Sequence, residues 1–141
     1  TLTQRVPLSG AVIVTTPQDI ALLDARKGLM MFRKVDVPVL GIVENMSVHR
    51  CPACGHESHI FGAGGGREMA SRYGVELLGE LPLELAIREQ ADGGCPTVAA
   101  APDSPAGLAY QSVARRAAAA LARAAAAGGA TFPKITIEDE A

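Results

Sequence analysis

The sequence of 141 residues contains no tryptophan, and aromatic residues make up only 4% of it. Its 13 lysines and arginines are balanced by 15 aspartates and glutamates, which gives a formal net charge of -2. Without a basic excess there is no electrostatic reason to expect nucleic acid as a partner. The sequence also has no apolar run near the roughly 20 residues that a membrane-spanning helix needs. We therefore expect neither nucleic acid nor a membrane among its partners.

Motifs for phosphate binding and hydrolysis are missing as well. The loop G-x-x-x-x-G-K-[ST], whose backbone and lysine hold nucleotide phosphates, occurs nowhere in the sequence. No Ser/His/Asp set or pair of carboxylates suggests another catalytic centre. We therefore expect no ATPase activity from this chain by itself. No signal-peptide pattern is recognisable either, and a cytoplasmic location is expected.

Cysteine is scarce, with three residues in the chain. A domain of this size does not need disulfide bonds for stability, and three is an odd number. Cys51 and Cys54 are spaced as C-x-x-C, which in an intracellular protein indicates metal or redox chemistry. Cys95 stands alone and is interpreted as a thiol with no special task. The functional prediction therefore concerns the first two cysteines.

Two thiolates two residues apart can chelate one metal, but they do not complete a site. Structural zinc takes four ligands, and cubane clusters usually take four cysteines. The missing ligands are expected either from His49, His56 or His59 in the same loop or from a second copy of the chain. A zinc knuckle, a thioredoxin-like redox pair and cysteines without a ligand remain as alternatives. For each histidine, an unligated position in a solvated loop is favoured over ligation.

Strand and helix patterns alternate along the chain. Buried strands are predicted at residues 10–15, 39–43 and 75–81, with a further edge-like strand at 97–100. Helices are predicted at residues 20–33, 66–73, 83–90 and 105–127, the last with Ser104 as N-cap. A strand, a helix and a strand within roughly 30 residues indicate a parallel sheet. The predicted fold class is therefore α/β, and the run at 10–15 is apolar enough for a strand covered on both faces.

The long segment at residues 44–66 breaks this alternation, because it is polar, rich in glycine and without periodicity. Such a loop inside a compact domain is usually functional or disordered, and both paired cysteines lie in it. Its glycine-rich end, residues 61–67, could form a backbone nest that binds an anion at a helix N-terminus. We interpret the segment as a functional cysteine loop.

A sheet of so few strands would have one open edge. The first predicted strand, at residues 10–15, also has the apolar sequence of a strand from the centre of a sheet. We therefore expect the C-terminal portion of a larger, doubly wound, mostly parallel sheet of the P-loop NTPase type, flanked by helices. Residues 1–127 would form this portion, with the cysteine loop at 44–66, and residues 128–141 a C-terminal tail.

Five sequence blocks occur in a distinctive order. They are V-T-T-P-Q-D at 14–19, G-I-V-E-N-M-S at 41–47, C-P-A-C-G at 51–55, I-F-G and G-G-G-R within 60–67, and L-G-E-L-P-L at 78–83 followed by I-R-E at 87–89. Together they closely resemble the C-terminal half of the Mrp/ApbC-type iron–sulfur cluster carriers. These carriers are deviant P-loop ATPases related to MinD and ParA proteins. The resemblance covers residues 5–122.

The resemblance implies a function that the spacing alone does not. Members of that family are homodimers that hold a [4Fe-4S] cluster between the C-x-x-C motifs of two subunits and pass it to apo iron–sulfur proteins. On this pattern Cys51 and Cys54 are the cluster ligands, and ATP binding accompanies the cycle. Asn45 would contact the adenine base, and Pro82 and Leu83 would line the same pocket.

The family's Walker A loop and its acidic Mg²⁺ region precede the matched segment. ATP and Mg²⁺ binding are therefore expected only together with an N-terminal half that this sequence does not contain. Two other functions stay open from the residues. The chain could be a zinc-stabilised interaction module, or a fragment of a ParA/MinD-like ATPase without cluster function.

Overall fold

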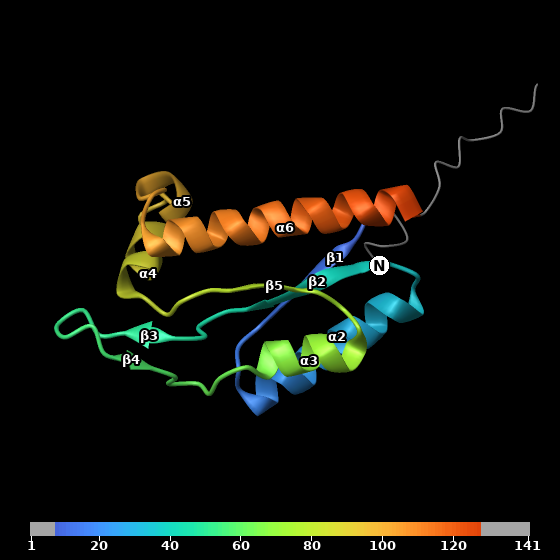
Figure 1. The fold of residues 1–141 in the computed structure, drawn as a ribbon, viewed down its shortest axis with the longest axis horizontal. Helices are drawn as coiled ribbons and strands as arrows, with labels where there is room; N and C mark the ends of the chain where they lie inside the picture. Colours follow the sequence, from blue (N-terminus) through green and yellow to red (C-terminus); the bar gives the residue numbers. More distant parts are fainter. Residues whose placement is uncertain (1–7, 128–141) are drawn as a thin grey trace, which may run out of the picture.

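The structure is a computed structural model that describes residues 8–127, with ten helices and strands in that range (Figure 1). In chain order they are β1 (Ala11–Thr15), α2 (Asp19–Lys34), β2 (Val39–Glu44), β3 (His49–Arg50), β4 (Glu57–Ser58), α3 (Gly65–Tyr73), β5 (Leu77–Glu80), α4 (Leu85–Asp92), α5 (Thr97–Ala100) and α6 (Pro105–Ala127). The predicted α/β class is confirmed. The tail assigned to residues 128–141 lies outside the described residues.

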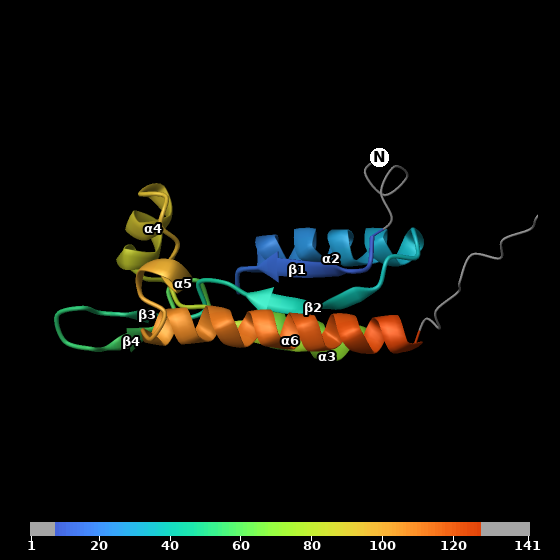
Figure 2. The same ribbon diagram turned by 90° about the horizontal axis from the view of Figure 1, so that it is seen from above.

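The sheet has three parallel strands in the order β1-β2-β5, with β2 in the middle. Helices α2 and α3 cover one face, and the long α6 crosses the other (Figures 1 and 2). Because the strands are parallel, their carboxyl ends lie at one edge, where β3, β4 and α4 are also found. That edge of an open α/β sheet is the usual location of a ligand site.

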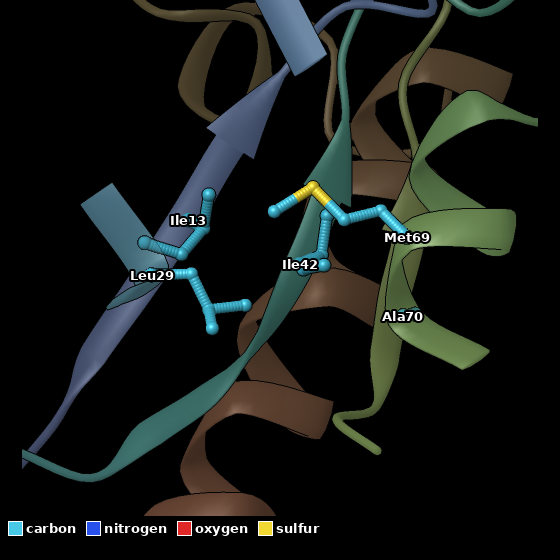
Figure 3. Close-up of a cluster of buried hydrophobic side chains, with 5 residues drawn as sticks. All are labelled: Ile13, Leu29, Ile42, Met69 and Ala70. Atoms are coloured by element: carbon cyan, nitrogen blue, oxygen red, sulfur yellow. The ribbon is translucent and has the colours of Figure 1, made fainter. Parts of the chain in front are cut away.

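Two apolar clusters hold the layers together. The first fills the space between the sheet and helices α2 and α3, and consists of Ile13, Leu29, Ile42, Met69 and Ala70 (Figure 3). The second lies under α6 and consists of Val43, Leu78, Leu81 and Ala120. Leu29, Ile42 and Leu78 are fully buried. Since successive residues of β2 point to opposite faces, Ile42 enters one cluster and Val43 the other.

Two predictions about strands were wrong. Residues 97–100 form the short helix α5 rather than an edge strand. Their small side chains after Pro96 form one helical turn, and Ala100 N–H donates to the Pro96 carbonyl at 2.9 Å. Within residues 8–127, strand β1 lies at an edge of the sheet and is covered mainly on the face of α2, since α6 packs over β2 and β5. Val14 on the other face is 61% exposed.

The start of α6 agrees with its predicted cap. Ser104 Oγ accepts the Gly107 N–H at 3.0 Å, and Pro105 is the first helical residue. None of the helices within residues 8–127 is long and apolar enough to cross a membrane.

Candidate metal centre: the cysteine hairpin

The cysteine loop is folded into an antiparallel hairpin, which we call the cysteine hairpin, residues 49–58. Strands β3 and β4 pair His49 with Ser58 and Arg50 with Glu57. At the tip, Cys51 N–H donates to the His56 carbonyl at 2.9 Å, and Gly55 N–H donates to the Cys51 carbonyl at 2.8 Å. Gly55 has a φ of +72°, which favours glycine. The hairpin projects beyond the carboxyl edge of the sheet (Figures 1 and 2).

The two thiols lie at the tip, where Cys54 is exposed and Cys51 is partly exposed. The neighbouring amides of Ala53 and Cys54, followed by the Cys54 thiol, hold the pKa of the Cys51 thiol below its ordinary value. A thiolate is the form of cysteine that binds metals and clusters. The turn therefore favours the ligating state of Cys51 and keeps both sulfurs reachable from solvent.

Of the three histidines predicted as possible ligands, His49 and His59 contact backbone carbonyls through Nδ1. His49 Nδ1 lies 3.0 Å from the Leu83 carbonyl oxygen, and His59 Nδ1 lies 2.8 Å from the Ser47 carbonyl oxygen. Among residues 8–127, no group of three or more His, Cys, Asp and Glu side chains is placed to hold a metal ion. Within that range the cysteine pair therefore supplies two ligands, a half-site. The described residues therefore do not support a metal site completed by histidines of the same loop.

Cys95 belongs to a different part of the fold, the turn between α4 and α5. It is exposed, and its N–H donates to the Gln90 carbonyl at 3.0 Å. It is not part of the cysteine hairpin.

An ion pair joins the two strands at the base of the tip. Arg50 donates to Glu57 Oε1 through Nε at 3.2 Å and through Nη2 at 2.5 Å. This contact raises the pKa of Arg50 and lowers that of Glu57. Both side chains are exposed, so the pair adds little to global stability. Its effect is local, because it links the paired residues of β3 and β4 next to Cys51.

The residues predicted to contact a nucleotide follow two neighbouring strands at the carboxyl edge of the sheet, but the groove that Asn45 lines includes neither Pro82 nor Leu83. Asn45 follows β2, and its N–H donates to the Thr15 carbonyl at 2.7 Å. Pro82 and Leu83 follow β5, beside the segment after Asn45, because Ser47 N–H donates to the Leu81 carbonyl at 3.0 Å. A groove along β1 and α2 is lined by Asn45, Thr15 and Thr16. A role of these residues in nucleotide binding stays a prediction.

Glu44 is a functional candidate that sequence reasoning missed. Its side chain is 1% exposed, and its Oε2 accepts the Gly66 N–H at 2.5 Å, at the start of α3. The glycine-rich segment 61–67, predicted to bind an anion, therefore contacts a carboxyl group of the protein itself at the N-terminal end of α3. The signal was an acidic residue ending an otherwise apolar strand. The contact ties the segment after the hairpin to the end of β2.

Comparison with known proteins agrees with the predicted resemblance. Residues 1–118 match the ParA family profile described as NUBPL iron-transfer P-loop NTPase. An "Iron-sulfur cluster carrier protein" of Pseudomonas fragi is 64% identical over 114 residues, which are 81% of this chain and 40% of that protein. The "Iron-sulfur cluster transfer protein NUBPL" of Mus musculus is 56% identical over 113 residues, which are 80% of this chain and 35% of that protein.

Solved structures share the fold. A nucleotide-binding protein from Archaeoglobus fulgidus in complex with ADP is 38% identical, with a TM-score of 0.54 over 61% of this chain and 35% of that one. The cell division ATPase MinD of Pyrococcus furiosus is 27% identical, with a TM-score of 0.60 over 77% of this chain and 41% of that one. The chain thus spans less than half the length of each of these proteins. By its sequence and its fold, it belongs to the ParA-type family of NUBPL iron-transfer P-loop NTPases.

Proposed function

We propose that this chain is the cluster-holding part of an iron–sulfur carrier whose cargo is a [4Fe-4S] cluster, with Cys51 and Cys54 as ligands. The observation that carries the proposal is the half-site itself, two reachable thiols at the tip of a projecting hairpin, where neighbouring amides lower the pKa of Cys51. A cargo site needs ligands that another protein can approach, whereas a structural zinc site is closed. The names of the relatives, a carrier and a transfer protein, agree with this.

The number of ligands supports a homodimer. A cubane cluster is usually held by four cysteines, and each chain offers two. Two hairpins related by a two-fold axis would supply all four from identical surfaces. Because the thiols lie beyond the sheet edge, the same tip could present the cluster to an apo iron–sulfur protein. A reducing compartment such as the cytoplasm would keep such thiols free, and it is the location we propose.

We further propose that Asn45, Pro82 and Leu83 face the base of a bound nucleotide. Their place at the carboxyl edge of a parallel sheet supports this, as does the ADP in the archaeal neighbour's description. This chain has no Walker A motif to hold phosphates. ATP and Mg²⁺ binding would therefore need residues outside these 141, and the chain alone should hydrolyse no ATP.

Anaerobic reconstitution with iron and sulfide tests the proposal. The wild-type chain should acquire the broad visible absorbance of a cysteine-ligated cluster, bind one [4Fe-4S] cluster per two chains, and double its mass in sedimentation. Removing the cluster with a chelator should reverse this doubling when the protein concentration is kept low. In a separate experiment, incubation of the cluster-loaded chain with an apo-ferredoxin should move the cluster to that acceptor.

Matched cysteine variants identify the ligands. Cys51→Ala and Cys54→Ala should each abolish cluster uptake, while Cys95→Ala should load like wild type because Cys95 lies in the turn between α4 and α5. A chain that binds zinc tightly and takes up no iron would contradict the proposal and favour the interaction module. Loading by Cys51→Ala at the wild-type level would also contradict it.

A further inference from the structure

We infer that His49 is a positioning residue for the cysteine pair, holding the cysteine hairpin against the loop between β5 and α4. This inference rests on the proposed function, because it concerns how the two ligands are aimed. His49 was a candidate ligand in the sequence, and its geometry indicates a different role. It begins β3, two residues before Cys51, and its ring reaches a backbone carbonyl of another element.

The hydrogen bond of His49 has only one possible direction. Its Nδ1 lies 3.0 Å from the Leu83 carbonyl oxygen, which can only accept, so Nδ1 carries the proton and donates. In the other direction, Leu83 N–H donates to the Val48 carbonyl at 2.8 Å. His49 and Leu83 form an isolated parallel bridge. We call this contact the hairpin seam; it joins residues 48–49 to Leu83.

A second set of hydrogen bonds fixes the base of the hairpin below the seam. Ser47 is buried, and both its N–H and its Oγ donate to the Leu81 carbonyl, at 3.0 and 3.1 Å. His59, just after β4, donates from Nδ1 to the Ser47 carbonyl at 2.8 Å. Both ends of the hairpin are therefore held. Of these contacts, that of His49 is the closest to the cysteines along the chain.

The cysteine hairpin needs such support because its own ladder is short. Strands β3 and β4 have two residues each, and a lone two-stranded hairpin is marginally stable in water. The direction in which the sulfurs project is then set by contacts at the base. A cluster shared by two chains demands that four sulfurs meet in one geometry, and hydrogen-bonded neighbours of ligands supply that orientation. Losing the His49 bond should therefore loosen the cluster without unfolding the domain.

Three substitutions separate the hydrogen bond from the ring. Asparagine can place an amide N–H near the position of Nδ1, glutamine places it farther out, and alanine removes it. We expect His49→Ala and His49→Gln to lose a reconstituted cluster to a chelator roughly fivefold faster than wild type, since one hydrogen bond contributes about 1 kcal/mol. His49→Asn should stay within about twofold of wild type on the same scale. His56→Ala, an exposed histidine of the same tip, is the matched control and should behave as wild type.

Two further readouts distinguish positioning from general instability. Visible circular dichroism of the cluster should change in His49→Ala and return in His49→Asn, while the far-ultraviolet spectrum stays constant. In the cluster-free chain, hydrogen exchange of the Leu83 amide should be faster in His49→Ala and His49→Gln than in wild type and His49→Asn. If His49→Ala fails to fold, the comparison of asparagine with glutamine decides the question.

The outcomes separate this inference from the proposed function. A wild-type chain that takes up no cluster overturns the proposed function, and Leu83 exchange then still tests the hairpin seam. Normal loading with equal cluster loss in wild type, His49→Ala and His49→Gln overturns the inference and leaves the proposed function intact. Equal defects in the asparagine and glutamine variants would also overturn it, because the position of the donor would then not matter.

Discussion

Among single residues, Gly66 has little room for a side chain because of its contact with Glu44. A Cβ at Gly66 would lie 3.0 Å from both Cβ and Oε2 of Glu44, whose buried carboxylate is bonded to the Gly66 N–H and has little room to move. Gly66→Ala should therefore lower the free energy of unfolding by about 1–3 kcal/mol. Urea denaturation followed by far-ultraviolet circular dichroism measures it.

Gly28 is the matched control, because it is also a helical glycine. A Cβ there would meet only Ile13 Cδ1, at an ordinary 3.9 Å. Gly28→Ala should raise the free energy of unfolding by roughly 0.5–1 kcal/mol, the gain expected when alanine replaces glycine in a helix. A Gly66→Ala midpoint at or above that of wild type would show that Glu44 can move aside.

The predictability of the site also differs from residue to residue. Cys51 and Cys54 were recognised because their chemistry is local, a pair within four residues. Glu44 was missed because its role depends on a hydrogen bond with Gly66, 22 residues away, and the sequence does not show that the two residues are in contact. His49 was considered as a ligand because of its type. Only the fold brings it beside the Leu83 carbonyl, 34 residues away, and so gives it a different role.

At the scale of elements, α6 shows how an alanine-rich helix packs closely on a sheet. Ala120 is buried against Val43, Leu78 and Leu81, whereas its neighbour Ala119 is exposed. Ala120→Leu should overpack this contact and lower the free energy of unfolding by about 1–3 kcal/mol. Ala119→Leu should change it by less than about 0.5 kcal/mol, because leucine is nearly as good a helix former. Urea unfolding of both variants checks the pair, and equal midpoints would contradict this packing.

Elements with strong periodicity were predicted correctly, and the errors fall where the local signal is short. The parallel strands and the helices α2, α3, α4 and α6 follow apolar spacing, caps and glycine stops. Helix α5 has only four residues, and the residues Thr97 and Val98 at its start favour a strand by their type. The structure instead shows one helical turn after Pro96. Strands β3 and β4 have two residues each, and they pair with one another apart from the isolated bridge between His49 and Leu83. No periodicity can emerge from two residues, so the cysteine loop was predicted without a hairpin.

For the molecule as a whole, one face of β1 is a part of the sheet that residues 8–127 leave exposed. β1 is an edge strand, and its residues Val12 and Val14 point to the same face of the sheet as α6. On that face α6 packs over β2 and β5 and leaves β1 exposed. Their side chains are 37% and 61% exposed. An exposed apolar edge strand is a site of self-association. We expect the cluster-free chain, kept reduced, to associate with increasing concentration through this strand.

Val14→Lys should weaken that association, because a charge on an edge strand opposes pairing with another sheet. Its free energy of unfolding should stay within about 0.5 kcal/mol of wild type, as for an exposed position. Val98→Lys, a comparably apolar and exposed site on α5, is the control and should associate like wild type.

Sedimentation velocity over a concentration series measures the association, and urea unfolding measures the stability. If Val14→Lys unfolds far more readily than wild type, this face of β1 is covered in solution. Undiminished association in Val14→Lys would assign the contact to a surface other than this strand.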